Sequence, residues 1–178
     1  VKGFRHILQG AEKGFMLQPN FIKGLKQLSK HHYTYDLLIY ANQIQEAIEL
    51  IKSVEDLPIV LDHIAKPSIK TKSIQDWERD IKSLAKYPNL NCKISGMATE
   101  ADWTTWKPED LKPYLDIVVE AFGVDRLLYG SDWPVCLVAS SYERWLNTIK
   151  DYFKEFSTSE QEKIFALNCE SFYTLEKA

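Results

Sequence analysis

The sequence of 178 residues predicts an α/β fold in which parallel strands alternate with helices. Three observations lead to this prediction. Five short apolar runs recur along the chain, and stretches with helical periodicity lie between several of them and after the last. No hairpin turn signal joins two neighbouring runs, so the strands are expected to be parallel. The runs are also continuously apolar, which is typical of strands that are buried on both faces.

The individual elements follow from the same patterns. The predicted strands cover residues 3–8, 35–40, 58–65, 90–96 and 126–132. Amphipathic helix faces are formed by residues three and four positions apart, namely Ile44, Ala47, Ile48 and Ile51, then Trp77, Ile81, Leu84 and Ala85, then Tyr114, Ile117, Val118 and Ala121, and finally Trp145, Leu146 and Ile149. Gly123 is expected to end the third of these helices. A capping box from Ser159 to Glu162 predicts a last helix.

Composition and charge exclude several classes of protein. The chain is 45% hydrophobic and 26% charged, as expected for a single globular domain over residues 1–178. The net charge is −3 and no basic tract is present, which argues against a nucleic-acid partner. No apolar run approaches the roughly 18 residues of a membrane span. Three widely spaced cysteines predict free thiols and a cytoplasmic location.

Ionisable and polar side chains gather where the predicted strands end. In chain order they are Arg5, His6, Gln9, Asp62, His63, Lys66, Lys93, Ser95 and Asp132, with Trp133 directly after the last. Ligands of parallel α/β proteins bind at the carboxyl ends of the strands, so these groups are expected to line one cleft. An acid, an imidazole and two cations in one cleft are suited to hydrolysis of an ester-like substrate.

Each of these residues also has a purely structural interpretation. A lone aspartate at a strand end, such as Asp132, commonly caps the following helix. His63 alone is typical of a hydrogen-bonded structural histidine, and Arg5 and Lys66 are of a type that is mostly exposed. The joint placement at four strand ends favours the functional interpretation.

The motifs GFRHILQ, YDLLIY, VLDHIAKP, NLNCKISGM and FGVDRLLYGSDWPVC resemble the amidohydrolase-related sugar lactonases, a group within the metal-dependent hydrolase superfamily of TIM barrels. The resemblance covers essentially the whole chain. It implies a (β/α)8 barrel and the opening of a lactone ring, often that of an aldonolactone such as a fucono-, rhamnono- or galactonolactone. It implies that Asp132 activates the hydrolytic water, that His63 is catalytic beside it, and that Arg5 meets the substrate.

The sequence also departs from that family. No H-x-H pair occurs, although the family carries one on its first barrel strand. Counted back from the Asp132 strand, the five predicted strands match the fourth to eighth of the barrel, so the domain is expected to be incomplete, without the first three βα units. A chain of this kind is expected to be inactive alone. Many relatives hold zinc with H-x-H and an aspartate, whereas this chain offers Asp132 and His63, two of the three protein ligands that a catalytic zinc needs.

The resulting prediction is a lactonase that acts on a small sugar lactone, with Asp132 and His63 catalytic and Arg5, His6, Gln9, Lys66, Ser95 and Trp133 binding the substrate. One divalent metal in the full-length protein, zinc held in part by Asp132 and His63, is an expectation and not a requirement. Two alternatives stay open, a related decarboxylase or hydratase and an inactive barrel fragment that needs its missing part. A homo-oligomer is compatible with the sequence.

Overall fold

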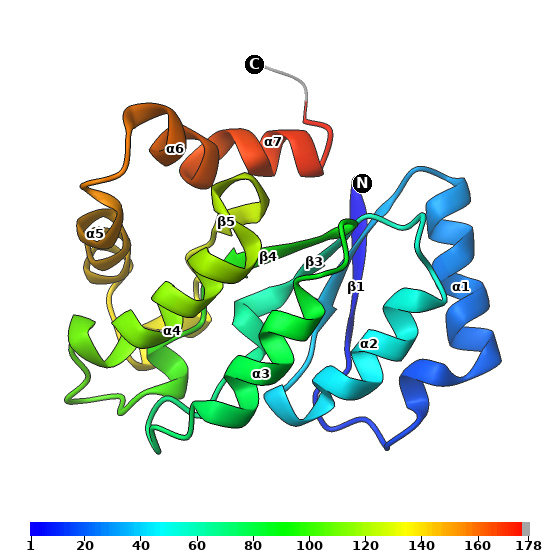
Figure 1. Ribbon diagram of the computed structural model, residues 1–178, viewed down its shortest axis with the longest axis horizontal. Helices are drawn as coiled ribbons and strands as arrows, with labels where there is room; N and C mark the ends of the chain where they lie inside the picture. The colour runs from blue at the N-terminus through cyan, green and yellow to red at the C-terminus, as the bar shows by residue number, and fades with distance from the viewer. Residues whose placement is uncertain (176–178) are drawn as a thin grey trace.

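The computed structural model describes residues 1–175 and has five parallel strands in one sheet, in the order β1-β2-β3-β4-β5 (Figure 1). The strands are β1 (Gly3–Ile7), β2 (Thr34–Leu38), β3 (Ile59–Leu61), β4 (Leu90–Ile94) and β5 (Leu127–Tyr129). The helices are α1 (Pro19–Lys30), α2 (Ile44–Lys52), α3 (Gln75–Leu84), α4 (Pro108–Phe122), α5 (Tyr142–Phe153), α6 (Thr158–Glu162) and α7 (Asn168–Phe172). This arrangement confirms the predicted α/β class with parallel strands in sequential order.

The two faces of the sheet differ in chemistry. Residues that face the helices belong to one apolar core, which includes Tyr35, Leu37, Ile59, Leu61, Cys92, Ile94 and Leu127. Their sequence neighbours point to the opposite face, because side chains alternate along a strand. That inner face carries Asp36 on β2 and Lys93 on β4, both only partly buried. The expectation of strands that are apolar and buried on both faces was therefore wrong for β2 and β4, and also for β1, none of whose residues is buried.

The observed strands end earlier than the predicted ones. The run 58–65, for example, is a strand only from Ile59 to Leu61, and Asp62–Ala65 form a tight turn. The run 126–132 likewise stops being a strand after Tyr129. Apolar character alone did not mark these ends, because the turn residues after β3 are as buried as the strand itself.

Local signals explain several helix boundaries. Pro108 begins α4, and Gly123 follows it with a φ of 66°, a left-handed conformation that favours glycine. The capping box of α6 lies two residues earlier than predicted, because the Ser157 side chain accepts from the backbone of Glu160 and the Glu160 carboxylate accepts from the backbone of Ser157. The predicted box from Ser159 to Glu162 was wrong, since Ser159 already lies inside the helix.

The two edge strands are finished differently. Asn168, at the start of α7, partly covers the β5 edge. Its side-chain Nδ2 donates to the backbone carbonyls of Val124 (2.7 Å) and Leu127 (2.8 Å). Among residues 1–175, β1 pairs only with β2, which leaves its other edge open. Figure 1 shows α7 lying across the end of the sheet at which β1 begins.

Candidate functional site

The turn after β3 has an unusual backbone. Four consecutive residues have positive φ, at 54° for His63, 48° for Ile64, 58° for Ala65 and 46° for Lys66. Such a left-handed turn costs roughly 1–2 kcal/mol for each non-glycine residue. Trp77 on α3 helps to hold it, because the indole Nε1 donates to the Ile64 carbonyl at 2.9 Å. Backbone strain of this kind concentrates at functional sites, where it fixes side-chain direction.

The strained turn aims the His63 imidazole at two polar groups. Nδ1 lies 2.7 Å from the Ser95 hydroxyl, which follows β4, and Nε2 lies 3.5 Å from Oδ1 of Asp132, which follows β5. Burial lowers the pKa of His63, and the nearby carboxylates of Asp62 and Asp132 only partly oppose that effect. The lowered pKa favours the neutral imidazole, whose Nδ1 is hydrogen-bonded to Ser95 and whose Nε2 lies near Asp132.

Asp132 presents a carboxylate with one free oxygen. Its backbone has a φ of 56°, and its carbonyl accepts from the amide of Cys136 at 2.8 Å. Oδ1 faces His63, whereas Oδ2 is buried and has no hydrogen-bond partner among the described residues. A buried carboxylate oxygen that lacks a partner is costly. A water or a substrate hydroxyl that reaches Oδ2 would supply the missing hydrogen-bond donor.

Gly96 leaves room for the imidazole. A Cβ at this position would lie 2.8 Å from Cγ of His63, and the φ of 61° already disfavours other residues. We expect Gly96→Ala to displace His63 and to lower kcat/KM at least tenfold, because catalytic geometry tolerates little displacement. Gly123→Ala is the matched control, since Gly123 has a φ of 66° with nothing within 4 Å of its added Cβ.

The measurement is kcat/KM of the two full-length variants, with thermal unfolding to report the strain that they share. Gly123→Ala should lose stability and keep its activity. Equal activities of the two variants would show that the close packing of Gly96 against His63 has no part in catalysis.

A group of four charges lies beside this pair on the inner face. Asp62 is fully buried, and its carboxylate contacts Arg5 Nη1 at 3.1 Å and Lys93 Nζ at 2.9 Å. Lys93 also contacts the Asp36 carboxylate. Burial alone would lower the pKa of Lys93, but Asp62 and Asp36 outweigh it and raise that pKa. The guanidinium of Arg5 stays half exposed, so it retains donors for a ligand.

Three of the predicted substrate-binding residues have other partners. Lys66 Nζ lies 2.9 Å from Glu100 Oε1, in the loop after β4. The Ser95 hydroxyl is hydrogen-bonded to His63. His6 stacks on Phe15 with ring centroids 5.5 Å apart, on the helix side of β1 and facing away from Arg5. The placement of His6 in the cleft was wrong, because alternation along β1 sends it to the opposite face.

The other predicted residues lie nearer to expectation. Gln9 follows β1, and its Nε2 is buried without a hydrogen-bond partner in the described part of the chain. Trp133 is 64% exposed and directly follows Asp132. Arg5 lies in the middle of β1 and not at its end, and it reaches the site through Asp62.

Sequence reasoning gave no role to three residues that complete these contacts. They are Asp36, Glu100 and Tyr173, which bind Lys93, Lys66 and Asp36, respectively. The signal for Asp36 was present, because a charged residue inside the apolar run YDLLIY requires a buried partner. Nothing in the sequence pattern marked Tyr173, since its partner is 137 residues away.

The site supplies two metal-ligating side chains, His63 and Asp132. Among residues 1–175, no group of three or more His, Cys, Asp or Glu side chains is arranged to hold a metal ion. A catalytic zinc takes three protein ligands, so these two residues do not suffice for one by themselves. The three cysteines are free, and none lies in such a group.

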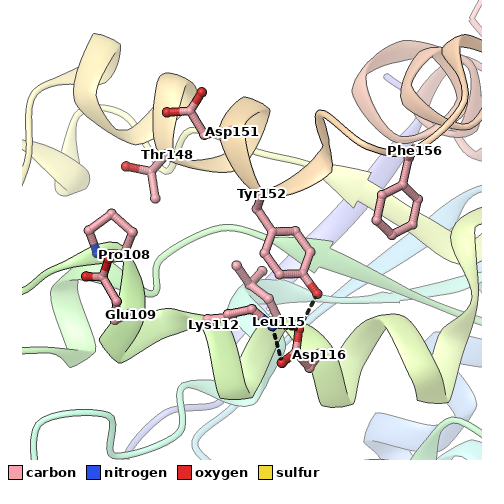
Figure 2. Close-up of a pocket in the computed structure, with 9 residues that line it drawn as sticks. All are labelled: Pro108, Glu109, Lys112, Leu115, Asp116, Thr148, Asp151, Tyr152 and Phe156. Carbon is pink, nitrogen blue, oxygen red and sulfur yellow. Dashed lines mark hydrogen bonds and ion pairs between the residues drawn. The ribbon is translucent and has the colours of Figure 1, made fainter.

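A separate groove of 510 Å³ lies between α4 and α5 (Figure 2). Its lining includes Lys112, Asp116 and Tyr152. None of the predicted site residues lines it, and no strand contributes to it.

None of the helices formed by residues 1–175 combines the length and apolar character needed to cross a membrane.

The chain is similar to known proteins over nearly its whole length. It is 36% identical over 163 residues to L-fucono-1,5-lactonase of Burkholderia multivorans, covering 82% of this chain and 55% of that protein. It is 30% identical over 183 residues to L-fucono-1,5-lactonase of Burkholderia ambifaria, covering 99% of this chain and 62% of that protein. The chain thus spans a little over half the length of these relatives.

A solved structure supports the same relationship. An amidohydrolase from Burkholderia multivorans, crystallised with bound zinc, superposes with a TM-score of 0.94 at 31% identity, over 98% of this chain and 64% of that one. This superposition, together with the five parallel strands in sequential order, confirms the predicted α/β fold of the amidohydrolase-type barrel. The sequence profile of the amidohydrolase family matches residues 1–175. The chain belongs to the amidohydrolase family.

Proposed function

We propose that the full-length protein carrying this chain hydrolyses the ring ester of a sugar lactone, with Asp132 as the general base. The observation that carries the proposal is the Asp132 carboxylate, whose Oδ1 faces a buried, neutral His63 while Oδ2 has no partner in the described chain. The relatives named L-fucono-1,5-lactonase support a sugar lactone as the substrate.

The proposed reaction uses these groups in order. Asp132 takes a proton from water through Oδ2 as the water oxygen bonds to the lactone carbonyl carbon. The ring carbon–oxygen bond then breaks, and the proton returns to the departing ring oxygen, which leaves as the hydroxyl of the opened acid. His63 orients Asp132 when its proton is on Nε2 and the Ser95 hydroxyl donates to Nδ1.

Arg5 is proposed to bind the substrate oxygens, including the carbonyl oxygen as it gains negative charge. Its guanidinium contacts Asp62 through one nitrogen only, so its other donors are free among the described contacts. Gln9 is proposed to donate from its buried Nε2, and Trp133 to lie against the sugar ring. Lys66 is proposed to act through its ion pair with Glu100, and Ser95 through its hydrogen bond with His63. If the full-length protein holds a zinc, His63 and Asp132 would be ligands of it, and the metal would polarise the carbonyl.

The test is a panel of aldonolactones that includes L-fucono-1,5-lactone, assayed in weak buffer with a pH indicator, because each opened ring releases one proton at neutral pH. We expect the full-length protein to accelerate acidification with at least one lactone, above the spontaneous rate. No acceleration with any lactone, with or without added Zn²⁺, would overturn the proposed function.

A further inference from the structure

Three residues form a Lys–Asp–Tyr triad on the inner face of the sheet. Lys93 Nζ contacts the carboxylate of Asp36, and the hydroxyl of Tyr173 donates to the same carboxylate, 2.8 and 2.9 Å from its two oxygens. The ammonium also lies over the Tyr173 ring, 5.5 Å from its centroid. Tyr173 directly follows α7, so this contact ties the carboxy-terminal segment to β2 and β4.

A second triad of the same composition lies on the outside of the molecule. Lys112 Nζ contacts the Asp116 carboxylate at 2.8 and 2.9 Å, and the Tyr152 hydroxyl donates to it at 2.8 Å. Lys112 also lies over the Tyr152 ring, 5.9 Å from its centroid. Figure 2 shows the lysine and the tyrosine meeting at Asp116 in the groove between α4 and α5. The chain therefore contains its own control for the inner triad.

The two triads differ in what else the lysine touches. Within residues 1–175, Lys112 pairs only with Asp116, whereas Lys93 is shared between Asp36 and Asp62. Asp62 in turn holds Arg5 and directly precedes His63. Asp62 thus links the inner triad to two residues of the candidate site, Arg5 and His63. The outer triad contacts neither of them.

We propose that Tyr173 and Lys93 are positioning residues that keep Arg5 available for substrate. The inference rests on the proposed function. By donating a hydrogen bond to Asp36, Tyr173 stabilises part of the negative charge of that carboxylate. Asp36 therefore attracts the ammonium of Lys93 less strongly. Lys93 can then neutralise Asp62, so that Asp62 needs only one contact from Arg5. The rest of the guanidinium stays free to bind the lactone.

Removal of the tyrosine hydroxyl should reverse this balance. In Tyr173→Phe, Lys93 is the one remaining described donor to Asp36, so the ammonium turns away from Asp62, and Asp62 makes up the lost charge by taking a second contact from Arg5. Arg5 then has fewer free donors, so substrate binding weakens while Asp132 and His63 are unchanged. We expect an about tenfold rise in KM with kcat changed less than about threefold, a size typical of mutations that act through a contact network.

The experiment compares KM and kcat of full-length Tyr173→Phe and Tyr152→Phe on the best lactone, each alone and combined with Arg5→Ala. Tyr152→Phe should change neither constant. Tyr173→Phe should raise KM in the presence of Arg5 and have no further effect in its absence, because a residue that acts through Arg5 cannot act without it. Additive effects of Tyr173→Phe and Arg5→Ala, or equal effects of the two tyrosine variants, would overturn the inference.

A crystal structure of full-length Tyr173→Phe shows, without any substrate, whether loss of the hydroxyl changes the contacts of Asp62 with Lys93 and Arg5. It therefore tests this inference separately from the proposed function. We expect the Lys93–Asp62 contact, 2.9 Å here, to lengthen and Arg5 to gain a second contact with Asp62. Both contacts unchanged would overturn the inference even in an active lactonase. Both contacts changed would support it even if no lactone is hydrolysed.

Discussion

Asp132→Asn is expected to lower kcat of the full-length protein on its best lactone by about 10²–10⁴-fold, the usual effect of removing a positioned general base. The amide keeps the size of the carboxylate but cannot accept the proton of water at Oδ2. KM should change little, because the ring is bound by other groups. Steady-state kinetics give both constants, and circular dichroism reports whether the fold is intact.

Asp125→Asn is the control for this substitution. Asp125 is an exposed aspartate that pairs with Lys163 at 2.7 Å, far from the strand ends that build the site. Its variant should keep wild-type kinetics. A folded Asp132→Asn with near-normal kcat would contradict the role of Asp132 as general base.

Lys93→Met is expected to lower the free energy of unfolding by about 3–5 kcal/mol, the usual cost of removing one partner from a buried ion pair. The lysine neutralises both Asp36 and Asp62, and Asp62 is fully buried. Without the ammonium, Arg5 and Tyr173 are left to satisfy two carboxylates. Urea unfolding followed by circular dichroism measures the loss.

Lys112→Met is the matched control, because Lys112 belongs to the exposed triad. Exposed ion pairs contribute about 0–1 kcal/mol, so this variant should unfold almost like the wild type. Raising the pH should also remove the stabilising contribution of Lys93. The pKa of Lys93 is raised in the folded state, so its contribution is complete below its unfolded pKa and is lost as the pH rises through the folded pKa. A Lys93→Met variant as stable as Lys112→Met would show that the inner charges are solvated.

The fold was largely predictable because most of the βα units leave a local signal, although the sequence analysis did not identify α1. The apolar runs located all five strands, and residues such as Ile48 and Ile51 marked helix faces by their spacing alone. Strand ends were harder to predict, because the left-handed turn at His63 is buried and apolar residues such as Ile64 lie within it. A pattern of hydrophobicity cannot distinguish a buried strand from a buried turn.

The candidate site was predictable only in part. His63 and Asp132 each follow a strand, and the structure brings their side chains together as expected, because parallel strands end at one edge of a sheet. The contacts of Lys66 with Glu100 and of Tyr173 with Asp36 join distant segments, and no spacing rule reports them. His6 was misplaced because it is next to Arg5 in sequence, whereas alternation along β1 separates the two side chains.

In the proposed reaction, the unpartnered oxygen of Asp132 activates water on a lactone bound at the strand ends. The most direct measurement is a crystal structure of full-length Asp132→Asn with an unopened lactone. We expect one water between the side chain at position 132 and the lactone carbonyl carbon, with Arg5 contacting the substrate oxygens. A lactone whose carbonyl carbon lies beyond the reach of position 132, or a ring seated only in the groove between α4 and α5, would contradict it.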